Sequence, residues 1–390
     1  MPIYMRFGDV PPKRHIRLER EKRASYQQEG LCYEHVVTTG GFDRAYSIMY
    51  HLRPPTRVRS VEAVGSWRIS KAPEQALRHH HLRSSEMSRD GDPIRGRVPL
   101  LTNSDVTCYR CRPDMEQEML FRNATADEMI FIHRGGGVIE SSFGKLDYRE
   151  GDYVVIPRNT TYRIVPDNVI SEDHLVLESA GAIRIPERYR NSDGQIKLGA
   201  PYSERDFHGP REPLFVDRER DTEILIKDGL RLTRYVMAHH PFDVVGWDGF
   251  VYPYTFNVAD FEPITGTVHQ PPPIQQTFES KGFVICTFAP RMLDTHPLAI
   301  KVPYVHSNVD ADEVLFYVRG KFGSRKGIES GSLTLHPRGV PHGPHPGTIA
   351  ESANATRTEE LAVMFDTEQP LALTSDAVEL DDPDYPLSWI

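Results

Sequence analysis

The stretch ADEVLFYVRGKF, residues 311–322, decides the fold because it repeats the earlier stretch ADEMIFIHRGGG, residues 126–137. Both begin with Ala-Asp-Glu, continue with apolar residues suited to a β-strand and reach an Arg-Gly pair. A second pair follows in the same order, GDYVVIPRNTTY at 151–162 and GSLTLHPRGVPH at 331–342. Two matched stretches in one order indicate a duplicated structural unit.

Each copy has the pattern of strand pairs in a small β-barrel. One strand ends at a tight Arg-Gly turn, and a later glycine turn leads into a strand that stops at a proline. Such strand pairs, joined by a linker of variable length, are typical of the jelly-roll barrel called the cupin. The chain also spreads 31 prolines and 28 glycines over 390 residues, so long helices should be scarce.

We therefore predict a mainly β bicupin, made of two jelly-roll barrels. The expected N-terminal domain covers residues 1–280, with a degenerate cupin barrel whose core lies at about 100–180. The expected C-terminal cupin domain covers residues 281–390 and carries the metal site. The length of the chain allows more than one hydrophobic core, which agrees with this division.

The second copy carries three candidate metal ligands, His306, Glu313 and His342. Two imidazoles and one carboxylate suit Fe(II) and leave positions open for reactants, whereas a site closed by four ligands would be structural. The residues alone leave two questions open. Asp312 lies beside Glu313 and would point to the opposite face of a strand, so only one of the two carboxylates can be a ligand. The histidines around the turn at residues 337–341 could also be solvated.

The first copy has lost most of this set. Phe121 and Tyr162 stand where the second copy has its two histidine ligands, and only the carboxylate of Glu128 remains. We therefore expect the N-terminal barrel to lack a metal site and to serve packing and assembly.

Composition narrows the class of protein. Lys and Arg number 46 and Asp and Glu 55, so the net charge of −9 argues against nucleic acid or an anionic membrane as a partner. No apolar run approaches the roughly 20 residues of a spanning helix, and the first residues lack the apolar region of a signal peptide, so we expect a cytoplasmic protein.

Cys108 and Cys111 have CxxC spacing without a second such pair and are interpreted as free thiols. The run HHH at 79–81 is given no role.

From residue 240 to the C-terminus, the chain resembles the homogentisate 1,2-dioxygenases, and an earlier stretch also fits that family. The stretches that carry the resemblance are KLGAPYSERDFHGP (197–210), DVVGWDG (243–249), VPYVHSN (302–308), DEVLFYVRG (312–320), SLTLHPRGVPHGP (332–344) and AVMFDTEQPLALT (362–374). The resemblance implies an Fe(II) site formed by His306, Glu313 and His342. It selects Glu313 over its neighbour because the family's glutamate stands seven residues ahead of the Arg-Gly glycine.

The resemblance also implies roles around the metal. His269 would accept a proton or hydrogen bond from a substrate hydroxyl. His336 would line the pocket and orient the substrate or bound oxygen, or else support Glu313 through a hydrogen bond, and His342 would also contact the substrate. Phe322 stands where better-known members have a substrate-binding tyrosine, so one hydrogen bond to the substrate is lost.

The implied activity is the opening of the aromatic ring of homogentisate to maleylacetoacetate, in tyrosine and phenylalanine catabolism. The partners would be a small aromatic substrate and dioxygen, and the family implies a homo-oligomer, either a trimer or a hexamer. Two alternatives remain, a dioxygenase for a related hydroquinone or gentisate-type acid, and a metal-binding bicupin without oxygenase activity. The residue that would bind a substrate carboxylate is not indicated.

Overall fold

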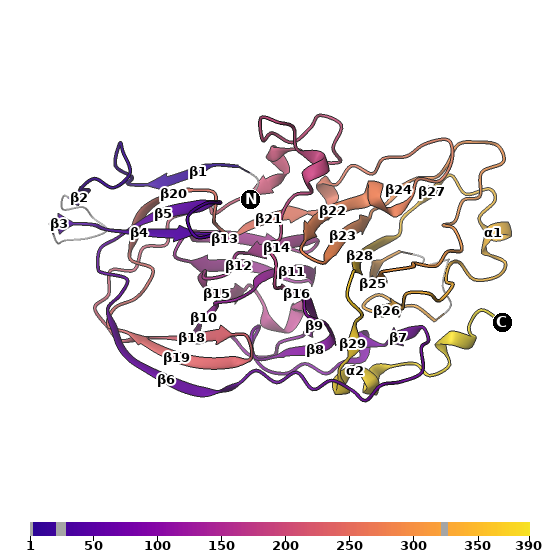
Figure 1. Cartoon of the computed structure of the whole chain (residues 1–390), viewed down its shortest axis with the longest axis horizontal. Helices are drawn as coiled ribbons and strands as arrows, with labels where there is room; N and C mark the ends of the chain where they lie inside the picture. The colour runs from indigo at the N-terminus through magenta and orange to yellow at the C-terminus, as the bar shows by residue number, and fades with distance from the viewer. Residues whose placement is uncertain (1–2, 21–28, 321–326) are drawn as a thin grey trace.

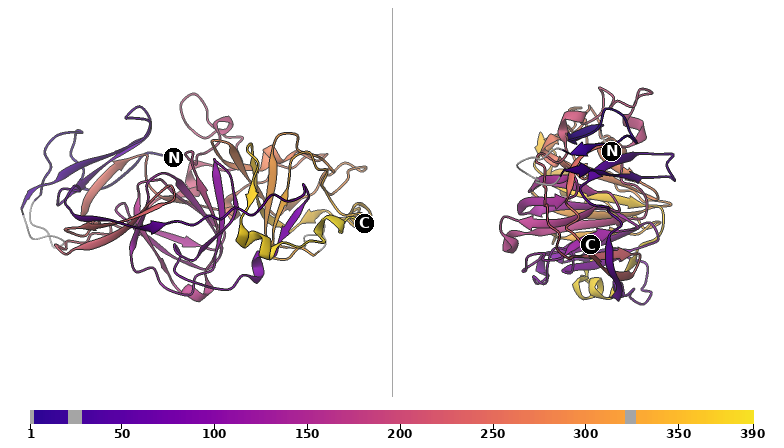
Figure 2. Two further views of the ribbon diagram at one scale, coloured as in Figure 1. Left: turned by 60° about the horizontal axis from the view of Figure 1, so that its bottom comes forward. Right: turned by 90° about the vertical axis from the view of Figure 1, so that its left-hand side faces the viewer.

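The computed structural model describes residues 3–20, 29–320 and 327–390. Within these ranges the chain is mainly β, and its two α-helices, α1 (Thr348–Glu351) and α2 (Ser375–Leu380), are short. The molecule is elongated, with a small sheet at one end, the first barrel in the middle and the second barrel at the other end (Figure 1, Figure 2). None of the helices in these ranges has the length and apolar character needed to cross a bilayer.

The first barrel is formed by two large sheets that enclose apolar side chains. In spatial order, one sheet contains β17 (Phe207–His208), β21 (Tyr254–Asn257), β14 (Asp152–Ile156), β11 (Asp127–Arg134), β16 (Asp173–Ser179), β9 (Val106–Cys111), β8 (Arg97–Thr102) and β29 (Ala372–Leu373). The other contains β13 (Gly144–Arg149), β12 (Gly136–Ser141), β15 (Thr161–Pro166), β10 (Leu120–Asn123), β18 (Thr222–Asp228), β19 (Arg231–Met237) and β6 (Val58–Ser66).

The second barrel and the small sheet complete the fold. The second barrel's main sheet runs β22 (Gln276–Ser280), β23 (Phe283–Phe288), β28 (Leu361–Thr367), β25 (Asp312–Arg319), β26 (Leu333–His336) and β7 (His80–Leu82). The small sheet runs β1 (Met5–Gly8), β20 (Val244–Gly249), β5 (Tyr46–His51) and β4 (Tyr33–Thr38). Two short pairs are β2 (Glu19–Arg20) with β3 (Gly30–Leu31), and β24 (Arg291–Met292) with β27 (Arg357–Thr358).

The bicupin prediction is confirmed, and the two barrels share one pattern of strand pairing. In the first barrel β11 pairs with β14 and β16, and in the second β25 pairs with β26 and β28. An arginine also braces the same point of each copy. The Arg158 side chain donates to Asp127 at 2.8 Å, and that of Arg338 donates to Asp312 at 3.0 Å.

The barrels exchange edge strands. The strand β7, from the N-terminal part of the chain, pairs with β26 of the second barrel, and β29, from the C-terminal part, pairs with β8 of the first. The expected boundary at residues 280 and 281 falls in the turn of the β22–β23 hairpin, where Ser280 faces Phe283. The division into residues 1–280 and 281–390 remains a proposal.

The two cysteines of the CxxC motif are free and buried, as the sequence predicts. Cys108 and Cys111 lie three residues apart on β9, so their side chains point to opposite faces of the strand and cannot share a ligand. Burial raises the pKa of each thiol to about 12.

Candidate metal centre

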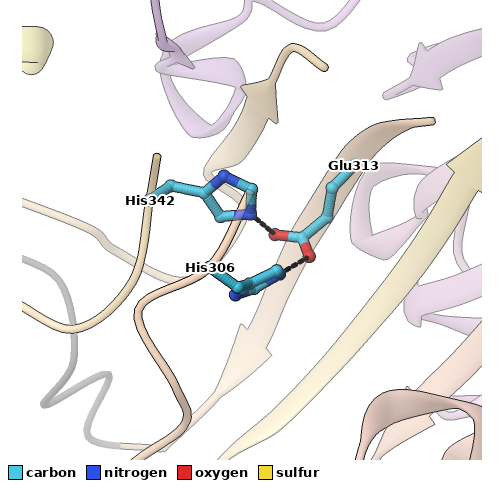
Figure 3. A group of neighbouring side chains, drawn as sticks. All are labelled: His306, Glu313 and His342. Carbon is cyan, nitrogen blue, oxygen red and sulfur yellow. Dashed lines mark ion pairs between the residues drawn. The ribbon is translucent and has the colours of Figure 1, made fainter. Parts of the chain in front are cut away.

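The three predicted ligands converge on one point of the second barrel. Ligand atoms of His306, Glu313 and His342 all lie within 4.8 Å of one another, and Figure 3 shows both rings directed at the carboxylate. The Nε2 atom of His306 lies 3.5 Å from Glu313 Oε2, and that of His342 lies 3.3 Å from Oε1. Glu313 and His342 are buried, whereas the His306 side chain is 34% exposed and opens the site to solvent.

Backbone pairing brings the ligands together. Glu313 is the second residue of β25, and His342 follows β26, the neighbouring strand. His306 precedes β25, and its backbone exchanges two hydrogen bonds of 2.8 Å with that of His342. This bridge holds the two rings on one side of the site, with centroids 4.3 Å apart. Alternation along β25 leaves Asp312 on the other face, where it accepts from Arg338.

The hydrogen bonds of the two rings select the tautomer that a metal requires. The Nδ1 atom of His306 donates to the Tyr304 carbonyl at 3.2 Å, and that of His342 to the Val340 carbonyl at 3.1 Å. Each ring therefore turns an unprotonated Nε2 toward Glu313, the usual arrangement for a metal-binding histidine. The buried Nε2 of His342 has no hydrogen-bond partner. A lone pair facing a carboxylate is stabilised by a cation between them, so the site fits a divalent metal ion.

The carboxylate of Glu313 is held ionised. Burial would raise its pKa, but the cationic forms of His306 and His342, together with the hydrogen bond from His336, outweigh burial and hold the pKa well below its usual range. An ionised carboxylate is the form that binds a metal. Glu313 thus carries the negative charge of the site over the whole physiological pH range.

His336 lies behind this carboxylate. Its ring is fully buried, its Nδ1 donates to Glu313 Oε1 at 2.8 Å, and its Nε2 lies 3.4 Å from the Tyr385 hydroxyl. It also stacks on the His342 ring, with centroids 4.5 Å apart. This geometry favours the second of its two expected roles, support of Glu313. Contact between His336 and a substrate remains a prediction.

A cavity of about 300 Å³ opens beside the metal ligands, with His306 in its wall. Phe288, Leu315 and Tyr317 give it an apolar side suited to an aromatic ring. His269 lines a smaller adjoining recess, half-buried, with its ring edge-on to Tyr304 at 4.7 Å. Burial lowers the pKa of His269. Phe322 lies outside the described residues.

Arg291 is the cavity's candidate partner for an anionic substrate group. Its guanidinium donates to the Ala289 carbonyl at 3.2 Å and forms no ion pair with any residue of the described ranges. Burial lowers its pKa. Of the two other cations of the wall, Lys301 also donates to a backbone carbonyl, that of Asp294, and Arg357 pairs with Glu359.

Two residues near the ligands were missed by sequence reasoning. His79, from the HHH run, donates to the Pro341 carbonyl at 3.0 Å, and its ring lies 6.3 Å from that of His342. Asp366 on β28 faces Glu313, and burial, with Glu313 acting in the same direction, raises its pKa to about 8. The unusual HHH run was the available signal for His79.

In the first barrel, an arginine lies beside the carboxylate that corresponds to the metal ligand Glu313. Tyr162 and Phe121 pair across β10 and β15 as His342 and His306 do in the second barrel. The Arg97 guanidinium donates to Glu128 Oε1, and the Tyr162 hydroxyl donates to Oε2 at 2.7 Å. A fixed positive charge thus lies beside Glu128, the carboxylate that corresponds to Glu313 in the second copy.

Comparison with known proteins gives concordant matches. Residues 93–258 match the family model described as homogentisate 1,2-dioxygenase N-terminal, and residues 254–390 match that described as homogentisate 1,2-dioxygenase C-terminal. A protein of Saccharolobus solfataricus, which carries the provisional name of a dioxygenase, is 38% identical over all of this chain and 99% of its own length.

Homogentisate 1,2-dioxygenases are more distant in sequence. That of Bradyrhizobium diazoefficiens is 27% identical over 69% of this chain and 62% of its own length. That of one Rhodopseudomonas palustris strain is 26% identical over 88% of this chain and 82% of its own length. Among solved structures, a cupin barrel protein of Leptotrichia buccalis matches 78% of this chain and 99% of its own, with a TM-score of 0.33 and 8% identity.

Proposed function

This chain belongs to the homogentisate 1,2-dioxygenase family and is a dioxygenase, and from that premise we propose that it opens the ring of homogentisate to maleylacetoacetate. We propose Fe(II) as its cofactor and tyrosine and phenylalanine catabolism as its context. The observation that carries the proposal is the meeting of His306, Glu313 and His342 beside an aromatic-lined cavity.

The donor set supports iron. The Nε2 atoms of His306 and His342 and the carboxylate of Glu313 would hold Fe(II), and such a set is typical of non-haem iron oxygenases. When bound, Fe(II) supplies a charged template on which dioxygen and an electron-rich ring can be held together. His336 would keep the Glu313 carboxylate in one orientation through its hydrogen bond of 2.8 Å.

His269 would receive the proton of a substrate hydroxyl. Its lowered pKa keeps the ring neutral at physiological pH, so that it can accept a proton. The exposed side of His306 and the shared wall residues Phe288 and Pro303 connect its recess with the main cavity. If the substrate carries two hydroxyl groups para to each other, one hydroxyl oxygen would lie at the metal ligands and the other at His269.

Arg291 would bind the substrate carboxylate, which supports an acidic substrate over a plain hydroquinone. A charged hydrogen bond contributes about 1.5–3 kcal/mol, equivalent to roughly 10- to 100-fold in affinity. Replacing Arg291 with Met should therefore raise KM for homogentisate by about that factor and leave KM for an uncharged hydroquinone unchanged. Arg357→Met is the matched control, because that arginine already pairs with Glu359.

The test is anaerobic loading with Fe(II), followed by measurement of oxygen uptake with homogentisate, gentisate and hydroquinone. We expect homogentisate to give the highest kcat/KM, with a ring-opened product identified by mass. Preference for gentisate would favour the second candidate, which the Tyr-to-Phe departure at Phe322 supports. Failure of the iron-loaded protein to consume oxygen with all three compounds would refute the proposal and favour a bicupin without oxygenase activity.

A further inference from the structure

A second cavity lies far from the metal centre, between the small sheet and the first barrel. Its volume is about 380 Å³, the size of a metabolite site, and it is bounded by β4, β5, β10 and β15 (Figure 1). Arg122, three histidines, several hydroxyl groups and Asn159 form its polar wall. Among the described residues, no carboxylate lines it.

Arg122 gives this cavity a half-buried positive charge. Phe121 points into the apolar core of the first barrel, so strand alternation directs Arg122 to the opposite face. Its Nε and Nη2 both donate to Thr161 Oγ1, at 2.8 and 2.6 Å, and it forms no ion pair within the described part of the chain. Burial lowers its pKa. Arg122 is half-buried, and a guanidinium that has lost part of its hydration without gaining a counter-ion would be stabilised by an anion from solution.

A chain of hydrogen bonds fixes what the histidines present to the cavity. Asp243 is fully buried and accepts from His51 Nδ1 at 2.8 Å and from the Arg53 backbone at 2.9 Å. Because the carboxylate only accepts, His51 Nδ1 carries the proton and its Nε2 accepts from His35 Nδ1, at 3.2 Å. His35 therefore presents an unprotonated Nε2. Burial lowers the pKa of His35 to about 4, so the ring stays neutral at physiological pH.

A third histidine in the cavity wall has ring nitrogens without hydrogen-bond partners. His239 lines the same cavity and is fully buried, yet neither of its ring nitrogens has a hydrogen-bond partner. Buried polar atoms are paired in most proteins, so unpaired ones in a cavity wall point to a ligand or ordered water. The wall thus combines one cation with hydrogen-bond acceptors and hydroxyl groups.

We propose that this cavity is a second binding site, for a small carboxylic acid that also carries a hydroxyl group. The ligand's carboxylate would pair with Arg122, and its hydroxyl would donate to His35. A monoanion matches the single cation of the wall. An inorganic anion such as sulfate would satisfy Arg122 but would leave the His35 acceptor and most of the volume unused.

The test uses isothermal titration calorimetry on the full-length, iron-loaded protein with 4-hydroxyphenylacetate as the probe. Arg122→Met should weaken binding to this site about 10-fold or more, as expected for loss of a charged hydrogen bond. Arg57→Met is the matched control, because Arg57 is nearby but exposed and paired with Glu219. Arg291→Met removes the proposed carboxylate contact at the metal centre and should leave this binding event in place.

Comparison of probes tests the ligand class. Phenylacetate, which lacks the hydroxyl, should bind several-fold more weakly, and sulfate should not displace the hydroxy acid. Equal binding by wild type and Arg122→Met would overturn the site, and equal binding of all three probes would overturn the ligand class. If Arg122→Met does not fold, Arg122→Lys replaces it and should also weaken binding, and the three probes on Arg291→Met test the ligand class. Oxygen uptake in Arg122→Met should equal that of wild type, which separates this result from the proposed function.

Discussion

Replacing Arg97 with Met should destabilise the first barrel strongly. Arg97, Glu128 and Tyr162 are all buried, and the guanidinium is the cation beside the Glu128 carboxylate. Methionine keeps much of the side-chain volume but removes the charge, so Glu128 would remain buried with Tyr162 as its donor. Removing one partner of a buried ion pair costs about 3–5 kcal/mol, and we expect a loss of this size in the free energy of unfolding.

Urea unfolding at neutral pH, followed by tryptophan fluorescence, measures this loss. The double variant Arg97→Met with Glu128→Gln should recover most of it, because no uncompensated charge stays buried and the amide still accepts from Tyr162.

Two results would refute this reasoning. One is an Arg97→Met variant that unfolds within about 0.5 kcal/mol of wild type, the scatter typical of surface substitutions. The other is a double variant no more stable than the single one. Either would mean that the guanidinium does not compensate the buried carboxylate of Glu128.

Two further changes test the metal centre and the packing between barrels. Glu313→Gln keeps the shape of the site but removes its anion, so iron retained after loading and desalting should fall at least about 10-fold by elemental analysis, and stoichiometric iron would contradict the ligand assignment. His133 on β11 packs against Phe316 on β25, with ring centroids 5.1 Å apart, and burial lowers the pKa of His133 from 6.5 to about 4. The unfolded chain then binds a proton that the folded state resists, and stability should fall by about 3 kcal/mol between pH 6.5 and 4, at about 1.4 kcal/mol per pKa unit. His133→Gln should reduce this loss in acid unfolding curves, and an unchanged pH profile would show that His133 is not its source.

The repeat made the barrels predictable because matching stretches keep matching registers. The pairing of Phe121 with Tyr162, and of His306 with His342, follows from aligning the two copies. Strand alternation predicted only that Glu313 and Asp312 face opposite sides, and the resemblance to the family selected Glu313. The Asp312 carboxylate accepts a hydrogen bond from the Arg338 side chain.

Other parts of the site depend on contacts that no local pattern encodes. Arg97 lies before the repeated stretches in the sequence, so aligning the two copies does not reveal it. Its ion pair with Glu128 forms only in the folded barrel, in which β8, the strand of Arg97, pairs with β9. His79, which directly precedes β7, reaches His342 from more than 200 residues away in sequence. The role of His336 stayed open because its spacing suits both a pocket residue and a support for Glu313, and only the 2.8 Å hydrogen bond favours the second.

The reciprocal placement of β7 and β29 interlocks the two halves of the chain. A protein cut near residue 280 would give a C-terminal piece without the strand that borders β26, and an N-terminal piece with an uncovered edge at β8. Unpaired edges of this kind invite aggregation. The exchanged strands therefore make each half of the chain depend on the other for a complete sheet, so we expect neither half to be expressed in soluble form alone.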